Sequence, residues 1–383
     1  MNSKLRTLAA ALLITTATAT GAVLMTTSAV EAAVRAAVGK ALNEAINDAK
    51  NGNGSAAMAK IHEAESVGGL TAAEQQAIAQ TKEYVAAKTG AGGGKTGTQA
   101  KFTNDYLAGR YSAVVGPDAD ELRKAGAMTG EDELLIAQAY YLMHNYEDCI
   151  RHIRAMGRLS QQELELLNRC AYEAHDTAAQ QAALEQLVVD FNQQKYWADL
   201  LDNADRTSGL NNQDTLDIYR VRLLTGTMKG KADFETATEI AIQLGFPVEA
   251  QAFAQKGLDT KQLDADRGAR LLNMAKTQSA TDAGNFAKAQ AAANAAKTGD
   301  ALVKIGDQLW SQGKYQDSLE SVKAGIAKGG LTNADAAQIS LARAYIGLHQ
   351  RDAAVKALAA VTKEAPAHTQ AIAKLWSIFA RTH

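Results

Sequence analysis

The stretch LVKIGDQLWSQGKYQDSLESVKAGI spans residues 302–326, and its plan returns at 339–366 as ISLARAYIGLHQRDAAVKALAAVTKEAP. In each, a helix-forming run ends at a turn residue, and a small residue follows five positions later: Gly313 then Ser318, and His349 then Ala354. Glycine closes helices readily because it tolerates the left-handed backbone. A small side chain lets two helices approach closely. Each stretch therefore predicts two antiparallel helices joined by a tight turn.

The same turn recurs along the chain. Further copies begin at His144, Gly245 and Gly284, with a weaker copy at Gly109. From this weaker copy to the turn at 349, the successive intervals are 35, 101, 39, 29 and 36 residues. The interval of 101 is about three times 34 residues, a length typical of helix-pair repeats. Two more degenerate units are therefore expected between His144 and Gly245.

A second kind of turn alternates with the first. Its copies are GLTAAE (69–74), RLSQQE (158–163), GLNNQD (209–214), GLDTKQ (257–262) and GLTNAD (330–335). Glycine ends one helix, and the Thr, Ser, Asn or Asp caps the next helix together with the acid or amide three residues on. Because only three prolines interrupt the chain, the sequence predicts an all-helical protein built from repeated helix pairs.

These features resemble tetratricopeptide-repeat proteins of an exported bacterial type. The best pair has the family's small residues at Gly306 and Ala342, its aromatic at Tyr315 and its closing Pro366. The leading tryptophan of the family is missing from all units. The resemblance covers about residues 101–383, and it implies a right-handed α-solenoid of stacked helix pairs whose concave groove binds peptides or protein surfaces.

The N-terminus has the layout of a secretory signal peptide. Lys4 and Arg6 precede the apolar run LAAALLI, a threonine-rich tail and the small residues of SAVEAA. This order predicts cleavage of residues 1–32 and a periplasmic or secreted mature protein that begins near Ala33. An uncleaved inner-membrane anchor is the alternative, because residues 8–25 approach the length that spans a bilayer.

The segment TGAGGGKTGT separates two helical regions. It ends like a phosphate-binding loop, but the first glycine of that motif is replaced by Thr89, and a helical pattern stands where a strand is required. We therefore expect a glycine-rich linker at 90–100 between an N-terminal degenerate helix pair or pairs (33–89) and the repeat array (101–383).

Charge narrows the class of partner. Removal of residues 1–32 leaves 38 basic residues (40 minus 2) and 41 acidic residues (42 minus 1), and no basic run occurs. This balance argues against nucleic acid and anionic membrane surfaces as partners. A protein or peptide partner is expected, with no membrane insertion after signal cleavage.

Motifs for catalysis or metal binding are incomplete. His62-Glu63 begins like a zinc-protease helix, but Ser66 replaces the second histidine. We expect no enzyme activity, no cofactor and no metal. The two cysteines, Cys149 and Cys170, fall on neighbouring helices in the repeat register, and either a disulfide or two buried thiols would fit an exported protein.

The register of the repeats also predicts groove-lining residues on the first helix of each pair. These are Glu131, Gln138, Tyr141, Asn168, Tyr172, His175, Asp307, Trp310 and Arg343. The alternative is that they are ordinary solvated residues. The last segment, TQAIAKLWSIFART (369–382), is expected to be a helix that caps the array, and a partner-binding helix is the alternative.

The function expected from these features is that of a non-enzymatic periplasmic scaffold or adaptor. A second hypothesis is an envelope-assembly chaperone, or an accessory subunit of an export or cell-wall machine. A third is a small-ligand receptor or an enzyme whose site lies in the groove.

Overall fold

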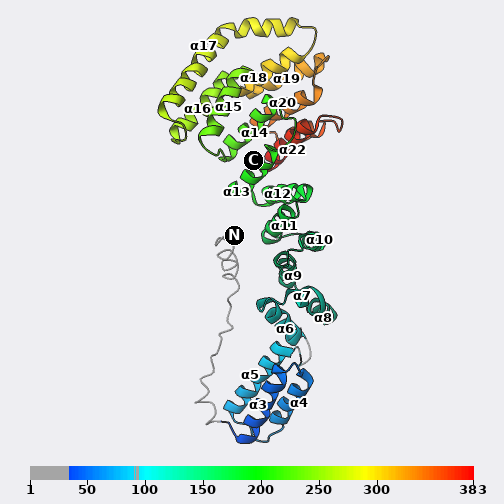
Figure 1. Cartoon of the computed structure of the whole chain (residues 1–383). Helices are drawn as coiled ribbons and strands as arrows, with labels where there is room; N and C mark the ends of the chain where they lie inside the picture. The colour runs from blue at the N-terminus through cyan, green and yellow to red at the C-terminus, as the bar shows by residue number, and fades with distance from the viewer. Residues whose placement is uncertain (1–33, 90, 92–94) are drawn as a thin grey trace. The chain divides into compact units, whose positions relative to one another are not determined.

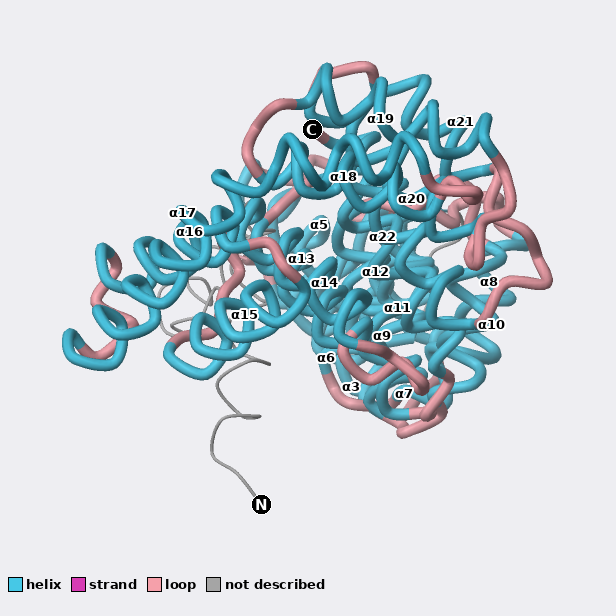
Figure 2. The backbone as a smooth tube through the Cα atoms, turned by 90° about the horizontal axis from the view of Figure 1, so that it is seen from above, coloured by secondary structure: helices cyan, strands magenta, loops and turns pink. Residues whose placement is uncertain are grey.

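The computed structural model describes residues 34–89, 91 and 95–383, and the part of the chain it describes is helical with no strand (Figures 1 and 2). The all-α prediction is confirmed, and helices that are neighbours in the sequence pack as in a solenoid. The superhelix handedness stays a prediction. The expected signal peptide (1–32) lies outside the described residues, as do residues 90 and 92–94 of the glycine-rich stretch. The chain divides into two compact units, residues 1–144 and residues 145–383.

In the described part of the first unit, from residue 34 on, three helices share one apolar core, rather than a single helix pair. Just before the first of them, the Arg35 guanidinium donates to both oxygens of the fully buried Glu74 carboxylate and to two carbonyl oxygens of the 66–71 turn. Thr71 and Glu74 form the expected capping box. The three helices are α3 (Ala36–Lys50), α4 (Gly54–Glu65) and α5 (Ala72–Thr89).

The remainder of this unit consists of two helices of 13 residues and three shorter elements between them. Its elements are α6 (Lys95–Leu107), α7 (Tyr111–Ala113), the π-helical turn η1 (Val114–Asp118), α8 (Ala119–Lys124) and α9 (Gly130–Leu142). Because α6 begins at Lys95, residues 95–100 are helical, and the expected linker is wrong over that part. Pro117 lies within the π-helical turn, and the Asp118 side chain that follows it is paired with Lys101.

The second unit contains the longer run of helices. Its elements are α10 (Tyr146–Ala155), α11 (Gln161–Glu173), α12 (Thr177–Phe191), α13 (Gln194–Ala204), α14 (Asn212–Thr225), α15 (Lys231–Leu244), α16 (Pro247–Asp259), α17 (Ala265–Ala295), α18 (Asp300–Ser311), α19 (Tyr315–Lys328), α20 (Ala334–Gly347), α21 (Arg351–Ala359) and α22 (Ala367–Thr382). Six helices, α10 to α15, occupy the long interval between the turns at His144 and Gly245. This number equals three pairs, as the spacing of the turns predicts.

Most of the predicted turns are present. His144, Gly245, Gly313 and His349 have φ values of 60°, 81°, 75° and 57°, so histidine takes the left-handed place that glycine fills elsewhere. Of the second kind of turn, Ser160 with Glu163 and Asn211 with Asp214 form complete capping boxes.

The turn expected at Gly257 is wrong in its position. This glycine is buried inside α16, and a Cβ there would lie 2.7 Å from Leu263 Cγ. Glycine is needed at this place for close packing. The left-handed residue of the turn is Lys261 (φ 57°), four positions further along.

The turn expected at Gly284 is absent. The helix α17, which has 31 residues in all, continues through this position and appears in Figure 1 as the long yellow helix. Its first part packs on α16, and Phe286 packs with the core that includes Leu302 and Ile305 of α18. Between the buried Ala275 and Ala293, no residue of this helix is fully buried, and Phe286 is partly buried. One long helix thus occupies the place where the repeat predicts a helix pair.

The last helix, α22, packs on more of the unit than the final pair. Besides α20 and α21 it contacts α12 and α14, and these helices lie close together in Figure 1. Lys374 of α22 pairs with Glu185 of α12 at 2.6 Å, and the fully buried Trp376 meets Trp310 and Phe379 edge to face. Eight of its residues are buried. Its apolar side is therefore occupied within the unit, which leaves no such face for the alternative role of a partner-binding helix.

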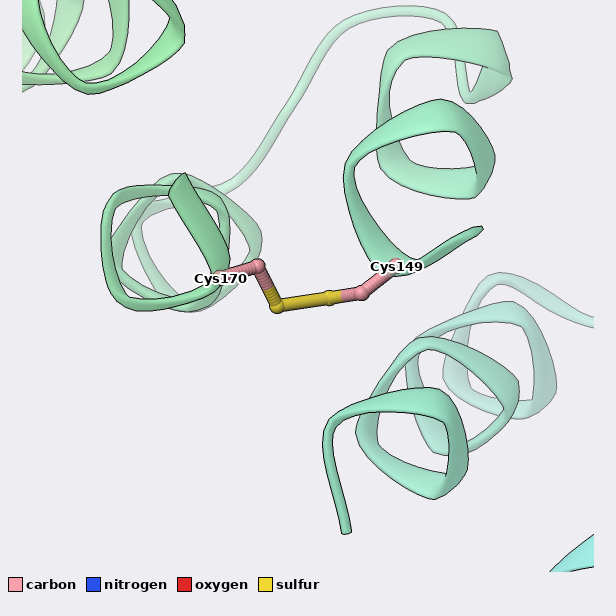
Figure 3. Close-up of a disulfide and its surroundings, with 2 residues drawn as sticks. All are labelled: Cys149 and Cys170. Carbon is pink, nitrogen blue, oxygen red and sulfur yellow. A yellow bond between two sulfur atoms is a disulfide. The ribbon is translucent and has the colours of Figure 1, made fainter. Parts of the chain in front are cut away.

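A disulfide joins Cys149 of α10 to Cys170 of α11 (Figure 3). Both residues are completely buried, and their Cα atoms are 6.3 Å apart. Of the two states that the sequence leaves open, the structure has the bonded one.

Candidate functional site

A cavity of about 270 Å³ lies in the second unit where α14, α18 and α20 meet the start of α22. The contributions of α18 are Asp300, Val303, Lys304 and Asp307, which are three or four residues apart and hence on one helix face. A similar face of α20 includes Ser340 and ends at Arg343. Side chains of α18 and α20, the helices that precede the turns at Gly313 and His349, thus form most of the wall.

A buried ion-pair network forms the floor of this cavity. The Arg343 guanidinium donates through Nη1 to Asp217 Oδ1 and through Nη2 to Asp307 Oδ1, each at 2.7 Å. Asp217 also accepts from Arg220 Nη1 at 2.9 Å. Arg220 in turn donates two 2.7 Å hydrogen bonds to the carboxylate of Glu249 on α16. Four helices are therefore joined by charged groups at one point.

The charged groups of the network are paired with one another and buried away from water. Burial alone would lower the pKa of Arg220, but the Glu249 and Asp217 carboxylates outweigh it, and the pKa is raised. Removing one partner from such a pair costs about 3–5 kcal/mol because the other charge stays buried. The network therefore fixes the side chains at the base of the cavity.

Trp310 covers one side of this network without lining the cavity. Its indole Nε1–H donates to the Arg343 carbonyl oxygen at 2.9 Å. The guanidinium carbons of Arg220 and Arg343 lie 5.1 Å and 5.4 Å from its ring centroid, close enough for cation–π attraction. A movement of Arg343 would therefore change the surroundings of the Trp310 indole.

Two further carboxylates line the cavity above this floor. Asp214 is paired with His368 at 2.8 Å, and burial raises the pKa of the Asp214 carboxyl. Asp300 accepts from the Thr332 backbone N–H at 2.9 Å, and this hydrogen bond lowers the pKa of the Asp300 carboxyl. Both acids lie in the first turn of their helices, where the helix dipole favours negative charge.

Two N–H groups in the wall have no hydrogen-bond acceptor among the described residues. They are Arg343 Nε, on a side chain whose residue is 2 % exposed, and Gln213 Nε2 on α14. Buried donors are nearly always paired in folded proteins, and leaving one unpaired is costly. Both nitrogens are buried in the wall, so an acceptor in the cavity reaches them only after a side chain moves.

The structure brings together three of the nine predicted groove residues. Asp307 and Arg343 are an ion pair, and Trp310 is bonded to the latter. Arg343 is buried by the network while it lines the cavity, so the alternative of an ordinary solvated residue does not hold for it. Asp307 keeps partial exposure, and its carboxylate lines the cavity.

The other six predicted residues are distributed over both units. In the first unit, Glu131 is exposed, Tyr141 is half-buried, and Gln138 accepts a 2.7 Å hydrogen bond from the Tyr106 hydroxyl. In the second unit, Asn168 is half-buried on α11, and Tyr172 is 61 % exposed. The expected place of His175 on this helix is wrong, because the residue lies in the following turn with φ 57°.

Sequence reasoning missed the network partners Asp217, Arg220 and Glu249. The pair in α14 stands in the segment DIYR, which reads as an exposed i, i+3 pair. Only the close approach of α16 and α20 buries it. No pattern in the sequence indicates that approach.

Comparison with known proteins adds no family. No protein-family model matches the chain, and no curated protein is similar enough to count as a relative. Within residues 34–89, 91 and 95–383, no helix combines the length and the apolar character that a membrane crossing requires. In the same part of the chain, no three His, Cys, Asp or Glu side chains are grouped as a metal site.

Proposed function

We propose that the protein is an exported, non-enzymatic scaffold or adaptor of the tetratricopeptide-repeat kind. It binds a segment of a protein or peptide partner, and the cavity between α14, α18 and α20 is the centre of its binding surface. The observation behind this proposal is the cavity itself, a polar recess lined mostly by α18 and α20, whose charged floor is fixed by ion pairs.

Preorganisation supports binding at this place. Side chains that are already immobilised lose little further entropy when a partner arrives, so more of the contact energy appears as affinity. The Asp217–Arg343–Asp307 bonds provide such immobilisation. The rim, which includes Lys304, Thr332 and Asn333, is exposed and within reach of a partner.

The size of the cavity supports a partner segment over a metabolite. Small-molecule sites usually have volumes of roughly 300–1,000 Å³, and this one has about 270 Å³. A volume at this lower limit suits one side chain of a larger partner.

The disulfide supports export. Disulfides persist in oxidising compartments such as the bacterial periplasm and are rare in the cytosol. A bond between Cys149 and Cys170 accordingly agrees with the signal peptide that the sequence predicts.

The test is affinity capture of partners by residues 33–383 from cross-linked envelope fractions, with mass spectrometry as the readout. Ala336→Tyr fills the cavity, because Ala336 lines it from α20. Ala334→Tyr is the matched control, since Ala334 is exposed on the same helix and lies about 200° around it.

One dominant partner that Ala334→Tyr retains and Ala336→Tyr loses would support the proposal. If no protein is enriched by the unmodified chain, the scaffold function is wrong. If both variants retain the partner, the cavity is not the binding site.

A further inference from the structure

The charge of the cavity wall is unbalanced. Four carboxylates line it, those of Asp214, Asp217, Asp300 and Asp307, against the two cations Lys304 and Arg343. Outside the lining, Arg220 and Glu249 neutralise each other, and His368 faces Asp214. The wall thus has an excess of two negative charges when that histidine is neutral. A cationic group is the complement of this excess.

A cation alone does not satisfy the wall, because the unpaired N–H groups of Arg343 and Gln213 require an acceptor oxygen. These donors and the carboxylates line the same cavity. A matching ligand therefore has a positive charge and a carbonyl oxygen within a few bonds of each other. An amino-acid residue with a cationic side chain, held in a peptide, has both groups.

We propose that the cavity takes one lysine or arginine side chain from an extended segment of the partner. Its cationic head pairs with Asp307 and the neighbouring carboxylates, and its backbone carbonyl accepts from Arg343 Nε or Gln213 Nε2 after a small side-chain movement exposes that nitrogen. This inference rests on the scaffold function proposed above and states which residue the scaffold recognises.

The volume agrees with one such side chain. Water occupies about 30 Å³ per molecule in the liquid, so about 270 Å³ corresponds to about nine waters. The aliphatic stem of a lysine or arginine can line the apolar part of the wall, formed by Val303, Ala337 and Ile339, while its charged end reaches the carboxylates.

Trp310 provides the assay. The chain has three tryptophans, and the indole N–H of Trp310 is bonded to the Arg343 carbonyl. In ¹⁵N-labelled residues 33–383, its side-chain NMR signal should move when the cavity fills. The signal of Trp197, which packs against Phe379 and not against this network, is an internal reference.

The probe is the capped peptide acetyl-Ala-Ala-Lys-Ala-Ala-amide, and its twin has norleucine in place of lysine. We expect a saturable shift of the Trp310 signal with the lysine peptide in the millimolar range. The norleucine peptide should bind at least about tenfold more weakly, because it lacks the charged hydrogen bonds.

Asp307→Asn tests whether the Asp307 carboxylate binds the cationic group. Asparagine keeps an oxygen for Arg343, so the network survives, and we expect affinity for the lysine peptide to fall about tenfold. Asp317→Asn is the matched control, since Asp317 is an exposed acid on α19 outside the cavity. An unchanged Trp197 signal in both variants would show that the fold is intact.

Three results would overturn the inference: no shift with the lysine peptide, equal shifts with lysine and norleucine, or equal losses in the two aspartate variants. Tighter binding of free zwitterionic lysine than of the capped peptide would also overturn it, in favour of a small-molecule site. If a partner is captured and then lost with Ala336→Tyr while the peptide tests fail, the scaffold function stands and the basic residue is wrong. If no partner is captured, the function itself fails.

Discussion

Replacing Gly284 by alanine should stabilise the exposed part of α17. Glycine in a helix interior is less favourable than alanine by about 0.8–1.0 kcal/mol. An added Cβ at Gly284 would meet no atom within 4 Å, so no steric cost offsets this gain. We therefore expect Gly284→Ala to stabilise α17 by about 1 kcal/mol.

The matched control is Gly313→Ala in the turn between α18 and α19. A Cβ there would also meet nothing within 4 Å, but the backbone φ is +75°. The left-handed conformation costs an L-residue about 1–2 kcal/mol, so this variant should be destabilised. The same substitution in equally open surroundings is thus expected to have opposite signs at the two sites.

The first assay is hydrogen exchange of backbone amides, followed by mass spectrometry of peptides from 276–292, because this part of the helix can open without global unfolding. When amides exchange through a local opening that is at equilibrium, an increase of about 1 kcal/mol in the free energy of opening slows exchange about fivefold. Urea unfolding of both variants supplies the global comparison. Faster exchange in Gly284→Ala, with a loss of stability like that of Gly313→Ala, would refute the continuous helix. It would restore the turn that the repeat pattern predicts.

Three further changes test other parts of the fold. Replacing Cys149 and Cys170 together by alanine should lower the free energy of unfolding by about 3 kcal/mol, and an unchanged urea midpoint would contradict a structural disulfide. The Arg35 hydrogen bond lowers the pKa of Glu74, so its contribution to stability is present above the unfolded value of about 4.3 and is lost as the pH falls below it. Urea unfolding should therefore show a smaller loss between pH 7 and pH 3 for Glu74→Gln than for the unmodified chain, and equal losses would count against this assignment. Trp376→Ala should cost about 3–5 kcal/mol in urea unfolding, as expected for a fully buried tryptophan, whereas a loss below 1 kcal/mol would mean that α22 is only a loosely attached end.

The local parts of the fold could be predicted from the sequence. The turns at Gly245 and Gly313 and the capping box of Asn211 with Asp214 depend on backbone conformation and on hydrogen bonds over a few residues. Such interactions depend only on the residues of the turn or cap itself. Histidine in place of glycine at 144 and 349 could also be assigned, because the repeat supplied the register.

The turn pattern failed at Gly284 for a physical reason. Glycine permits a left-handed turn but does not require one. Whether the chain folds back depends on where its flanking residues pack, and here α16 holds one end of α17 while α18 holds Phe286 at the other. Those contacts are absent from the local sequence.

The candidate site also has a part that the sequence predicts and a part that it does not. Asp307 and Arg343 could be placed on the inner faces of their helices, because helical periodicity assigns faces. Their pairing with each other and with Asp217, which is 126 residues before Arg343 in the sequence, could not be assigned.

The sequence by itself determined that this protein is helical and where several of its turns and caps lie. The tertiary structure decided that α17 continues through Gly284 as one helix, that α22 returns to α12 and α14, and that a charged network closes the floor of the cavity. The reason is that caps and turns are satisfied within a few residues, whereas the burial of a charge depends on which distant helix supplies its partner.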